Sequence, residues 1–331
     1  MDADDRTERL GDGPAPTPAA TPHLAKAPVA RPDLSQVSTE PGASKPDPIV
    51  KGRNITRQFG GLKAVDVDSI EIQRGVITAL IGPNGAGKTT LFNLLTGFDV
   101  PDSGEWSFNG TPLQRVSAYK VARLGMVRTF QLTKVLAKLS VIENMRLGAK
   151  GQSGERFFAA AFDFLWRKQE NDNTARADEL LARFKLDAKR EDFAGSLSGG
   201  QRKLLEMARA LMVDPELIML DEPMAGVNPA LKQSLLGHVK SLRDEGRTVL
   251  FVEHDMDMVR DISDWVIVMA QGRIVAEGTP DAVMANPAVI DAYLGAHHDT
   301  DLSEMDVEAL EAEAEAELDA EADVHHEETT A

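Results

Sequence analysis

Gly82-Pro83-Asn84-Gly85-Ala86-Gly87-Lys88-Thr89-Thr90 is the stretch of this chain that decides its fold. It follows an apolar run, residues 76–81, that we interpret as a buried strand, and it precedes residues 91–95, which we interpret as the first turns of a helix. In this context the pattern G-x-x-x-x-G-K-[ST] predicts a phosphate-binding loop. Its glycines let backbone N–H groups surround an anion, and the helix N-terminus adds a partial positive charge.

Two side chains of this loop have predicted roles in binding a nucleotide. Lys88 can reach the β- and γ-phosphates, and Thr89 can place its hydroxyl on Mg²⁺. The alternative is a glycine-rich turn before an ordinary helix, and roughly one chain in a hundred of this size should contain the pattern by chance. The flanking strand and helix favour phosphate binding.

A pair of adjacent acids follows a second apolar run. Residues 217–220 read as a buried parallel strand and lead directly into Asp221, Glu222 and a proline. Ligands bind at the C-terminal ends of such strands, so Asp221 can hold the Mg²⁺ shell and Glu222 can orient or deprotonate water. The alternative is that the two acids only form an acidic turn. This interpretation is weaker because the same chain also contains a phosphate loop.

Three further features have both a structural and a functional interpretation. Ser198 is a good N-cap for a helix over residues 201–212, and the neighbouring Gly199 and Gly200 leave the helix mouth open to a phosphate. His254 follows an apolar strand at residues 248–252, so it is either a structural histidine or a contact for a γ-phosphate. Phe59 is either a core residue or a platform on which a base stacks.

Simple patterns predict several other elements. Residues 55–59 and 65–72 alternate as two strands around a Gly60-Gly61 turn. Ser140 with Glu143 forms a capping box before a helix. Residues 155–186 read as helical with a polar break at 171–173, and residues 265–277 read as a hairpin.

Length and composition limit the class of protein. The 331 residues, 42% of them hydrophobic, suit one large domain or two small ones. Cysteine is absent, which excludes disulfides and thiolate metal sites. No apolar run reaches the 18 or more residues of a membrane span. The acidic start of the sequence lacks an apolar stretch, so we expect no secretory signal there.

The net charge of −17 comes mostly from one end. Residues 301–331 hold 13 Asp and Glu and neither Lys nor Arg, so residues 1–300 carry −17 + 13 = −4. This near-neutral remainder has no basic surplus that would favour nucleic acid. Residues 1–47 are rich in Pro, Ala, Thr and Asp, and residues 297–331 include an alternation of Glu and Ala. We predict that both segments are disordered tails around an ordered domain at 48–296.

At this point residues 48–296 resemble the nucleotide-binding subunits of ABC transporters. Five separated motifs follow that family's order and spacing: the phosphate loop, Gln131, residues 197–201, the Asp221-Glu222 pair, and His254. The resemblance implies an α/β P-loop NTPase core with an antiparallel β subdomain and an α-helical subdomain at about 132–214. It also implies an ATPase that uses ATP and Mg²⁺.

The resemblance implies a role for each matching residue. Glu222 matches the catalytic base, His254 the switch residue at the γ-phosphate, and Gln131 the residue that senses Mg²⁺ and the attacking water. Thr89, Gln131 and Asp221 would serve the metal, and Phe59 would stack on adenine. The nucleotide would be held by Phe59, Gly82, Pro83, Asn84, Gly85, Ala86, Gly87, Lys88, Thr89, Thr90, Ser198, Gly199, Gly200 and Gln201, the last four acting on the nucleotide of the other protomer.

Softer features resemble the branched-chain amino acid (Liv-type) importers. Many ABC ATPases have a Ser-Ala-Leu-Asp type loop after the acid pair, whereas this chain has residues 225–229 with Asn228 in place of Asp. The end of the domain, residues 289–295, also looks Liv-type. The implied partners are membrane permease subunits, a second copy or a paralogous ATPase, and indirectly an extracytoplasmic solute-binding protein, with the chain at the cytoplasmic face of the membrane.

Other functional classes stay open at this point. One is the ATPase of another ABC system with a different solute or an exporter, and another is a soluble ABC ATPase, which usually carries a second ATPase domain or a long coiled coil. A P-loop GTPase would need an Asn-Lys-x-Asp motif, and neither it nor a P-loop kinase would explain residues 197–201.

Overall fold

The computed structural model describes residues 31–129, 135–149 and 163–293, without the side chains of 163–168 and 230. A six-stranded sheet forms its centre, and every strand in it is parallel to its neighbours except β10 at one edge. Its order is β10 (Arg273–Gly278), β9 (Trp265–Ala270), β3 (Ile77–Ile81), β8 (Thr248–Val252), β7 (Leu217–Asp221) and β6 (Met126–Arg128). Every residue of β3, β7 and β8 is buried, as expected for strands covered on both faces.

A second sheet is antiparallel. Its order is β2 (Leu62–Gln73), β1 (Pro48–Phe59), β4 (Ser103–Phe108) and β5 (Thr111–Pro112). β1 and β2 pair across the Gly60-Gly61 turn, which confirms the predicted hairpin. Both strands extend further than the alternation of apolar residues suggested.

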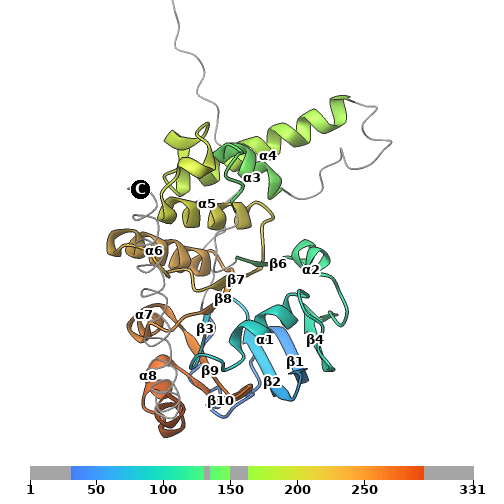
Figure 1. Ribbon diagram of the computed structural model, residues 1–331, viewed down its shortest axis with the longest axis vertical. Helices are drawn as coiled ribbons and strands as arrows, with labels where there is room; N and C mark the ends of the chain where they lie inside the picture. The colour runs from blue at the N-terminus through green and yellow to red at the C-terminus, as the bar shows by residue number, and fades with distance from the viewer. Residues whose placement is uncertain (1–30, 130–134, 150–162, 294–331) are drawn as a thin grey trace, which may run out of the picture.

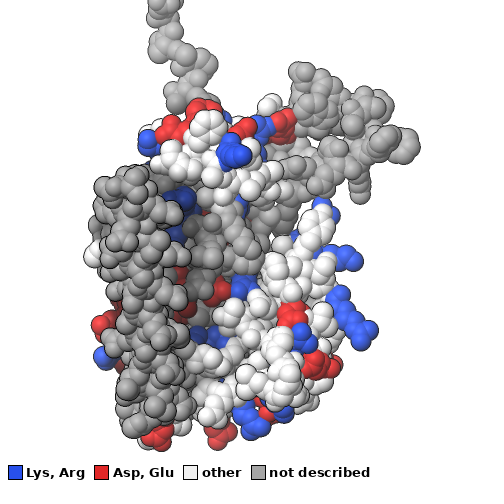
Figure 2. All heavy atoms as spheres, in the orientation of Figure 1, with Lys and Arg blue, Asp and Glu red and all other residues white. Residues whose placement is uncertain are grey.

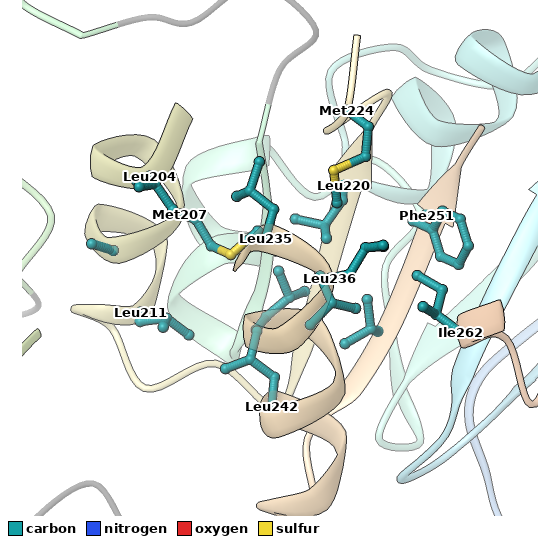
Figure 3. Close-up of a cluster of buried hydrophobic side chains, with 14 of the residues drawn as sticks. Leu204, Met207, Leu211, Leu220, Met224, Leu235, Leu236, Leu242, Phe251 and Ile262 are labelled. Atoms are coloured by element: carbon teal, nitrogen blue, oxygen red, sulfur yellow. The ribbon is translucent and has the colours of Figure 1, made fainter. Parts of the chain in front are cut away.

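Helices cover the parallel sheet on both faces (Figure 1). α6 (Pro229–Asp244), α7 (Met256–Ile262) and α8 (Pro280–Met284) supply buried residues to one core cluster. α1 (Lys88–Leu95), α2 (Ala118–Leu124) and the antiparallel sheet supply the other. Alternate residues of the parallel strands point into each cluster, and Figure 3 shows the first cluster where α6 lies over β7 and β8.

A third part is helical and lies beyond the β6 edge of the parallel sheet (Figure 1). It contains α3 (Val141–Leu147), α4 (Asp163–Arg183), α5 (Gly199–Leu211) and two short 3₁₀ turns, Asp187–Lys189 and Ala194–Ser196. The capping box predicted for Ser140 and Glu143 is present. The fold class is therefore the predicted one, an α/β core with an antiparallel β part and a helical part.

The polar break predicted at residues 171–173 is wrong, because α4 runs through it without interruption. Asn171 and Asp172 are exposed, so their side chains stay solvated and cost the helix only a few tenths of a kcal/mol each, on the order of their intrinsic propensity. The helix also carries the Thr174 hydroxyl, which donates to the Glu170 carbonyl 2.8 Å away in the same turn. The predicted helical start at residues 155–162 lies outside the described residues.

The prediction that the chain is disordered up to residue 47 is wrong for residues 31–47. Leu34 is buried, and Lys45 forms a buried ion pair with Glu277 at 2.7 Å. The backbone N–H of Lys45 donates to Glu71 in β2 at 2.7 Å. Composition alone cannot indicate such contacts with distant strands. The Pro-rich composition of the segment therefore predicted a start of the ordered domain that lies too late in the chain. The acidic C-terminal segment and residues 1–30 lie outside the described residues.

Candidate active site

A cavity of about 390 Å³ opens beside the phosphate loop. The loop connects β3 to α1, so the cavity lies at the C-terminal end of the parallel strands, where α/β sheets bind ligands. It is lined by Leu62, Lys63, Ala64, Asn84, Gly85, Ala86, Gly87, Lys88, Thr89, Thr90, Glu222, Gln271 and Gly272. The structure thus brings most of the predicted loop residues and one of the two predicted acids to a single cavity.

Two glycines of the loop are required by its packing. Gly82 has φ +145° and Gly87 has φ +97°, backbone conformations that other residues rarely adopt. A Cβ atom on Gly82 would lie 2.0 Å from the Met269 carbonyl oxygen, and one on Gly87 would lie 2.2 Å from the Ala64 carbonyl oxygen. The loop can therefore curl only because both positions lack side chains, and Gly87 also ends the curl as the left-handed N-cap of α1.

Lys88 folds back over the loop. Its ammonium donates to the carbonyls of Gly82 and Pro83, at 2.7 and 2.9 Å. Burial lowers the pKa of Lys88, and the carboxylates of Glu222 and Asp221 oppose that shift. A half-buried ammonium held at the rim of a cavity, with acids facing it, is well placed to meet an anionic phosphate.

The two acids have different surroundings. Asp221 ends β7, is buried, and forms an ion pair with Arg128 of β6 at 2.6 Å. Glu222 is the next residue, lines the cavity, and has φ +44°. Its backbone N–H donates to the Val252 carbonyl of β8 at 3.1 Å, so the sheet fixes the turn that carries this carboxylate. A positive φ at a residue other than glycine often accompanies a functional position.

The oxygen donors at this site suit Mg²⁺. Thr89 offers a hydroxyl in the cavity and Asp221 a carboxylate at the end of β7. Within the described ranges, no group of three or more His, Cys, Asp or Glu side chains could hold a metal. Magnesium needs no such cage, because it is usually bound through one or two carboxylates together with substrate phosphates and water. The residues present therefore fit this metal.

His254 follows β8 at the same sheet edge, and its side chain is 67% exposed. The preceding Glu253 is buried, and its carboxylate accepts the backbone N–H groups of Met224 and His254 at 3.1 and 3.4 Å. Burial is the main cause that raises the pKa of Glu253. Glu253 thus ties the loop after the acids to the start of the segment that presents His254.

The residues predicted to act on a second nucleotide lie apart from this cavity. Ser198 caps α5, its hydroxyl oxygen accepting the backbone N–H of Gln201 at 3.2 Å, and the Gln201 side chain accepts the Ser198 N–H in return. This capping box uses the Ser198 oxygen as acceptor and leaves its O–H as a donor. Ser198 and Gly199 are exposed, a Cβ on Gly199 would have open space around it, and neither residue lines the cavity.

Several other predicted residues do not line the cavity, among them Gly82, Pro83, Asp221 and His254. Phe59 is 49% exposed at the end of β1 and does not line the cavity, and the Arg57 guanidinium lies over its ring with 4.6 Å to the centroid. Gln131 lies outside the described residues. The stacking role of Phe59 and the metal-sensing role of Gln131 remain predictions.

The structure also adds residues that the sequence pattern did not identify. Leu62, Lys63 and Ala64 at the start of β2 form one wall of the cavity, and Gln271-Gly272, the β9–β10 turn, forms another. These segments meet through backbone hydrogen bonds, from Asp66 N–H to the Gly272 carbonyl and from Gly272 N–H to the Ala86 carbonyl. The only local signal was the Gln-Gly turn of the predicted hairpin, and it did not indicate proximity to the loop.

Acidic and basic side chains occur side by side at the lower end of the face shown in Figure 2. None of the helices in the described part of the chain combines the length and the apolar character needed to cross a membrane.

Comparison with known families gives two matches. The model of the ABC transporter family matches residues 65–225, and the model of the branched-chain amino acid ATP-binding cassette transporter family matches residues 273–299. The first match falls inside the predicted range of the resemblance, residues 48–296, and the second extends past its end to residue 299.

Curated relatives match nearly along their whole length. A probable branched-chain amino acid transport ATP-binding protein LivG of Archaeoglobus fulgidus is 42% identical over 248 residues, covering 75% of this chain and 96% of the relative. The high-affinity branched-chain amino acid transport ATP-binding protein BraF of Pseudomonas aeruginosa is 39% identical and is covered to 98%. LivG of Escherichia coli K12 is 38% identical, with the same 98% coverage.

Solved structures share the fold. A nucleotide-free ATP-binding cassette from an ABC transporter superposes with a TM-score of 0.65 at 37% identity, covering 74% of this chain and 98% of that one. The ADP conformation of an ATP-binding cassette of an ABC transporter superposes with a TM-score of 0.64 at 36% identity, covering 75% and 99%.

Proposed function

The chain belongs to the ABC transporter family as an ATP-binding, ATP-hydrolysing subunit, and from this premise we propose that it powers the import of branched-chain amino acids. Support for the solute comes from the names of relatives at 38–42% identity and from the branched-chain family model over residues 273–299. The relatives from Pseudomonas aeruginosa and Escherichia coli are named as high-affinity amino acid transport proteins, which supports import as the direction of transport. Residues 225–229, with Asn228 accepting the Leu231 N–H as the N-cap of α6, agree with the Liv-type variant of this loop.

In this proposal the cavity residues divide the work of phosphoryl transfer. Lys88 leaves its two carbonyl partners and binds the β- and γ-phosphates, while the loop amides between Gly82 and Thr90 surround them. Glu222 accepts the proton of the attacking water, and His254 contacts the γ-phosphate from the next strand. Because phosphoryl transfer relies mostly on positioning and charge stabilisation, a fixed turn at Glu222 is an advantage.

Magnesium would be held by Thr89 and Asp221, and Gln131 would sense the metal and the attacking water. When bound, the metal neutralises the charge that develops on the phosphate oxygens. Without the metal, the Asp221 carboxylate is buried and paired with Arg128 at 2.6 Å, and it does not line the cavity.

The observation that carries the proposal is the separation of the two halves of the site on one chain. The cavity holds the phosphate loop and Glu222, whereas Ser198 and Gly199 are exposed elsewhere, and a Cβ at Gly199 would have open space around it. A second copy, or a paralogous ATPase, would supply the missing residues head to tail. Two nucleotides would then be enclosed, and closure would do the mechanical work.

We further propose that the chain docks on permease subunits at the cytoplasmic face of the membrane. An extracytoplasmic solute-binding protein would deliver the amino acid to those subunits. The chain itself would meet neither the solute nor nucleic acid.

The Glu222→Gln variant tests the catalytic assignment. We expect it to bind ATP, to form a stable dimer and to lose about 10²-fold or more of its turnover, in line with removal of a general base. The matched variant Ser198→Arg should abolish turnover and leave nucleotide binding by the isolated chain intact. Normal hydrolysis by Glu222→Gln, or loss of monomer binding in Ser198→Arg, would contradict the division of roles.

The transport assignment needs the membrane partners. The chain should copurify with integral membrane subunits, and proteoliposomes holding the complex and its solute-binding protein should accumulate leucine only with internal ATP. Glu222→Gln is the control for energised uptake. ATPase stimulation by solutes of another class, with no response to branched-chain amino acids, would replace the proposed solute.

A further inference from the structure

Lys203 connects α5 to the loop that carries the proposed base. It lies on the helix that Ser198 caps, one turn into α5. Its ammonium donates to the carbonyls of Glu222 and Pro223, at 3.4 and 3.2 Å, and to the carbonyl of Ala225. Three carbonyls of one short loop therefore converge on a single cation from the neighbouring helix.

The same loop is held from its other side by Glu253. The Glu253 carboxylate accepts the Met224 N–H at 3.1 Å and is buried. Between these two braces the Ala225 N–H donates to the Glu222 carbonyl at 3.2 Å and closes the turn. Glu222 itself has φ +44°, a conformation that persists only where the surroundings fix it. The Glu222 N–H bond to the Val252 carbonyl fixes the start of the turn, and Lys203 and Glu253 hold the residues that follow.

The rest of the contact between α5 and this region is apolar. Figure 3 shows Leu204 and Met207 of α5 facing Leu220 of β7, with Leu235 of α6 between them. Gly200 adds a close approach, because a Cβ there would lie 1.8 Å from a terminal methyl group of Leu231 in α6. This packing holds α5 in place but has no directional contact with the loop after Glu222. The hydrogen bonds of Lys203 are directional, so they connect the position of α5 to particular carbonyl groups of that loop.

The electrostatic surroundings favour a charged Lys203 in this role. Burial lowers its pKa, and three carboxylates face it and oppose that shift: Glu253, Glu206 of the same helix, and Glu222. Hydrogen bonds from a charged donor are about twice as strong as neutral ones. Removing the Lys203 cation therefore weakens the contact between α5 and the loop more than removing one neutral hydrogen bond would.

We propose that Lys203 is a positioning residue that couples the N-terminus of α5 to the base of the same chain. This inference rests on the proposed function, in which Ser198 and Gly199 act on the nucleotide held by the partner. The two ends of the coupling then belong to different sites: Ser198 contacts one nucleotide, and Glu222 accepts the proton of the water that attacks the other. When the N-terminus of α5 contacts the nucleotide of one site, Lys203 positions the Glu222 carboxylate of the other site. Hydrolysis at the two sites is then cooperative.

The test compares Lys203→Met with Lys203→Arg in the full chain. We expect Lys203→Met to lower kcat at least tenfold and to bring the Hill coefficient for ATP close to 1. Its affinity for a fluorescent ATP analogue, measured at low protein concentration where the chain is single, should change less than twofold. Lys203→Arg should restore most of kcat and cooperativity, since it keeps the charge. Lys240→Met is the matched control, because it removes a lysine of α6 whose ammonium pairs with Asp261 of α7 at 3.0 Å, away from the loop that carries Glu222.

Further outcomes separate this inference from the proposed function. The double variant Lys203→Met/Glu222→Gln should still dimerise with ATP, because positioning the base is not needed for closure. If Glu222→Gln alone dimerises but the double variant does not, Lys203 acts on closure and the coupling is overturned. Unchanged kcat and Hill coefficient in Lys203→Met would also overturn it, while failure of Glu222→Gln itself to dimerise would reject the proposed function. Lys203→Gln serves if the Met variant does not fold.

Discussion

Gly82 begins the phosphate loop directly against the main chain of Met269, so that a Cβ atom at Gly82 would lie 2.0 Å from the Met269 carbonyl oxygen. The Met269 backbone cannot move aside without disturbing β9, which pairs with β3 over residues 265–268 and with β10 at Met269. The contact is therefore between two fixed parts of the sheet. It explains why a loop that must bind an anion starts with glycine even before any ligand is considered.

Gly82→Ala should destabilise the fold and abolish nucleotide binding. The added methyl meets backbone, and the φ of +145° is unfavourable for alanine, so we expect a loss of about 3 kcal/mol or more in the free energy of unfolding. Gly75→Ala is the control, because Gly75 also has a positive φ but open space around its Cβ position, and should lose only about 1–2 kcal/mol. Equal losses in denaturant titrations would show that the contact with Met269 is unimportant.

The buried pair of Arg128 and Asp221 gives a second prediction. Arg128→Met leaves a buried carboxylate without its cation, so we expect a loss of about 3–5 kcal/mol in the free energy of unfolding, measured without metal. The double variant Arg128→Met/Asp221→Asn should lose less than the sum of the two single variants, since no charge then stays uncompensated.

Metal supplies an independent readout of the same pair. In Arg128→Met, Mg²⁺ with ADP should raise the melting temperature by more than it does in the natural chain, because the metal then provides the missing positive charge. An increase equal to that of the natural chain would mean that Asp221 does not face the metal.

The sequence predicts those parts of the molecule whose determinants are neighbours in the chain. The phosphate loop, the acid pair after β7, the capping box at Ser140 and the N-cap at Ser198 each depend on fewer than ten consecutive residues, because helix caps and tight loops are local structures. These elements together were enough to place the cavity at the correct end of the sheet.

The remaining features depend on contacts between distant segments. The cavity walls at 62–64 and 271–272 are joined to the loop only by the folding of both sheets, and α7 went unpredicted between two strong strand signals. Arg128 has no local sign of its ion pair with Asp221, which lies 93 positions away. Tertiary packing also overrides propensity in α4, where polar residues continue a helix.

His238 predicts how stability depends on pH. Its ring stacks on Phe184 with 4.3 Å between centroids, and burial, helped by Arg183 and Lys185, lowers its pKa below the ordinary 6.5. Below pH 6.5 the unfolded chain therefore binds a proton that the folded chain resists, so stability falls as the pH falls from 6.5 toward the folded pKa. His238→Phe keeps the stacking and should flatten this slope.

Chemical denaturation between about pH 5 and 7 measures the effect. At the upper end of this range the natural chain and His238→Phe should differ only by the packing of the new ring, and the difference should then shift in favour of the variant as the pH decreases. Two parallel curves would show that His238 does not contribute to the slope.

Lys45 tests whether the N-terminal segment at 31–47 is part of the domain. Its ammonium lies 2.7 Å from Glu277, with the two side chains 1% and 2% exposed, and 4.6 Å from the centroid of the Trp265 ring. Lys45→Met leaves Glu277 buried without its cation, so we expect a loss of about 3–5 kcal/mol in the free energy of unfolding. Lys51→Met removes an exposed partner 4.0 Å from Glu71 and should cost at most about 1 kcal/mol.

If the two variants unfold alike, the segment does not stabilise the domain, and deletion of residues 1–47 should then leave the melting temperature unchanged. A lower melting temperature in that deletion, together with a stable Lys51→Met, would establish that the ordered domain begins before β1.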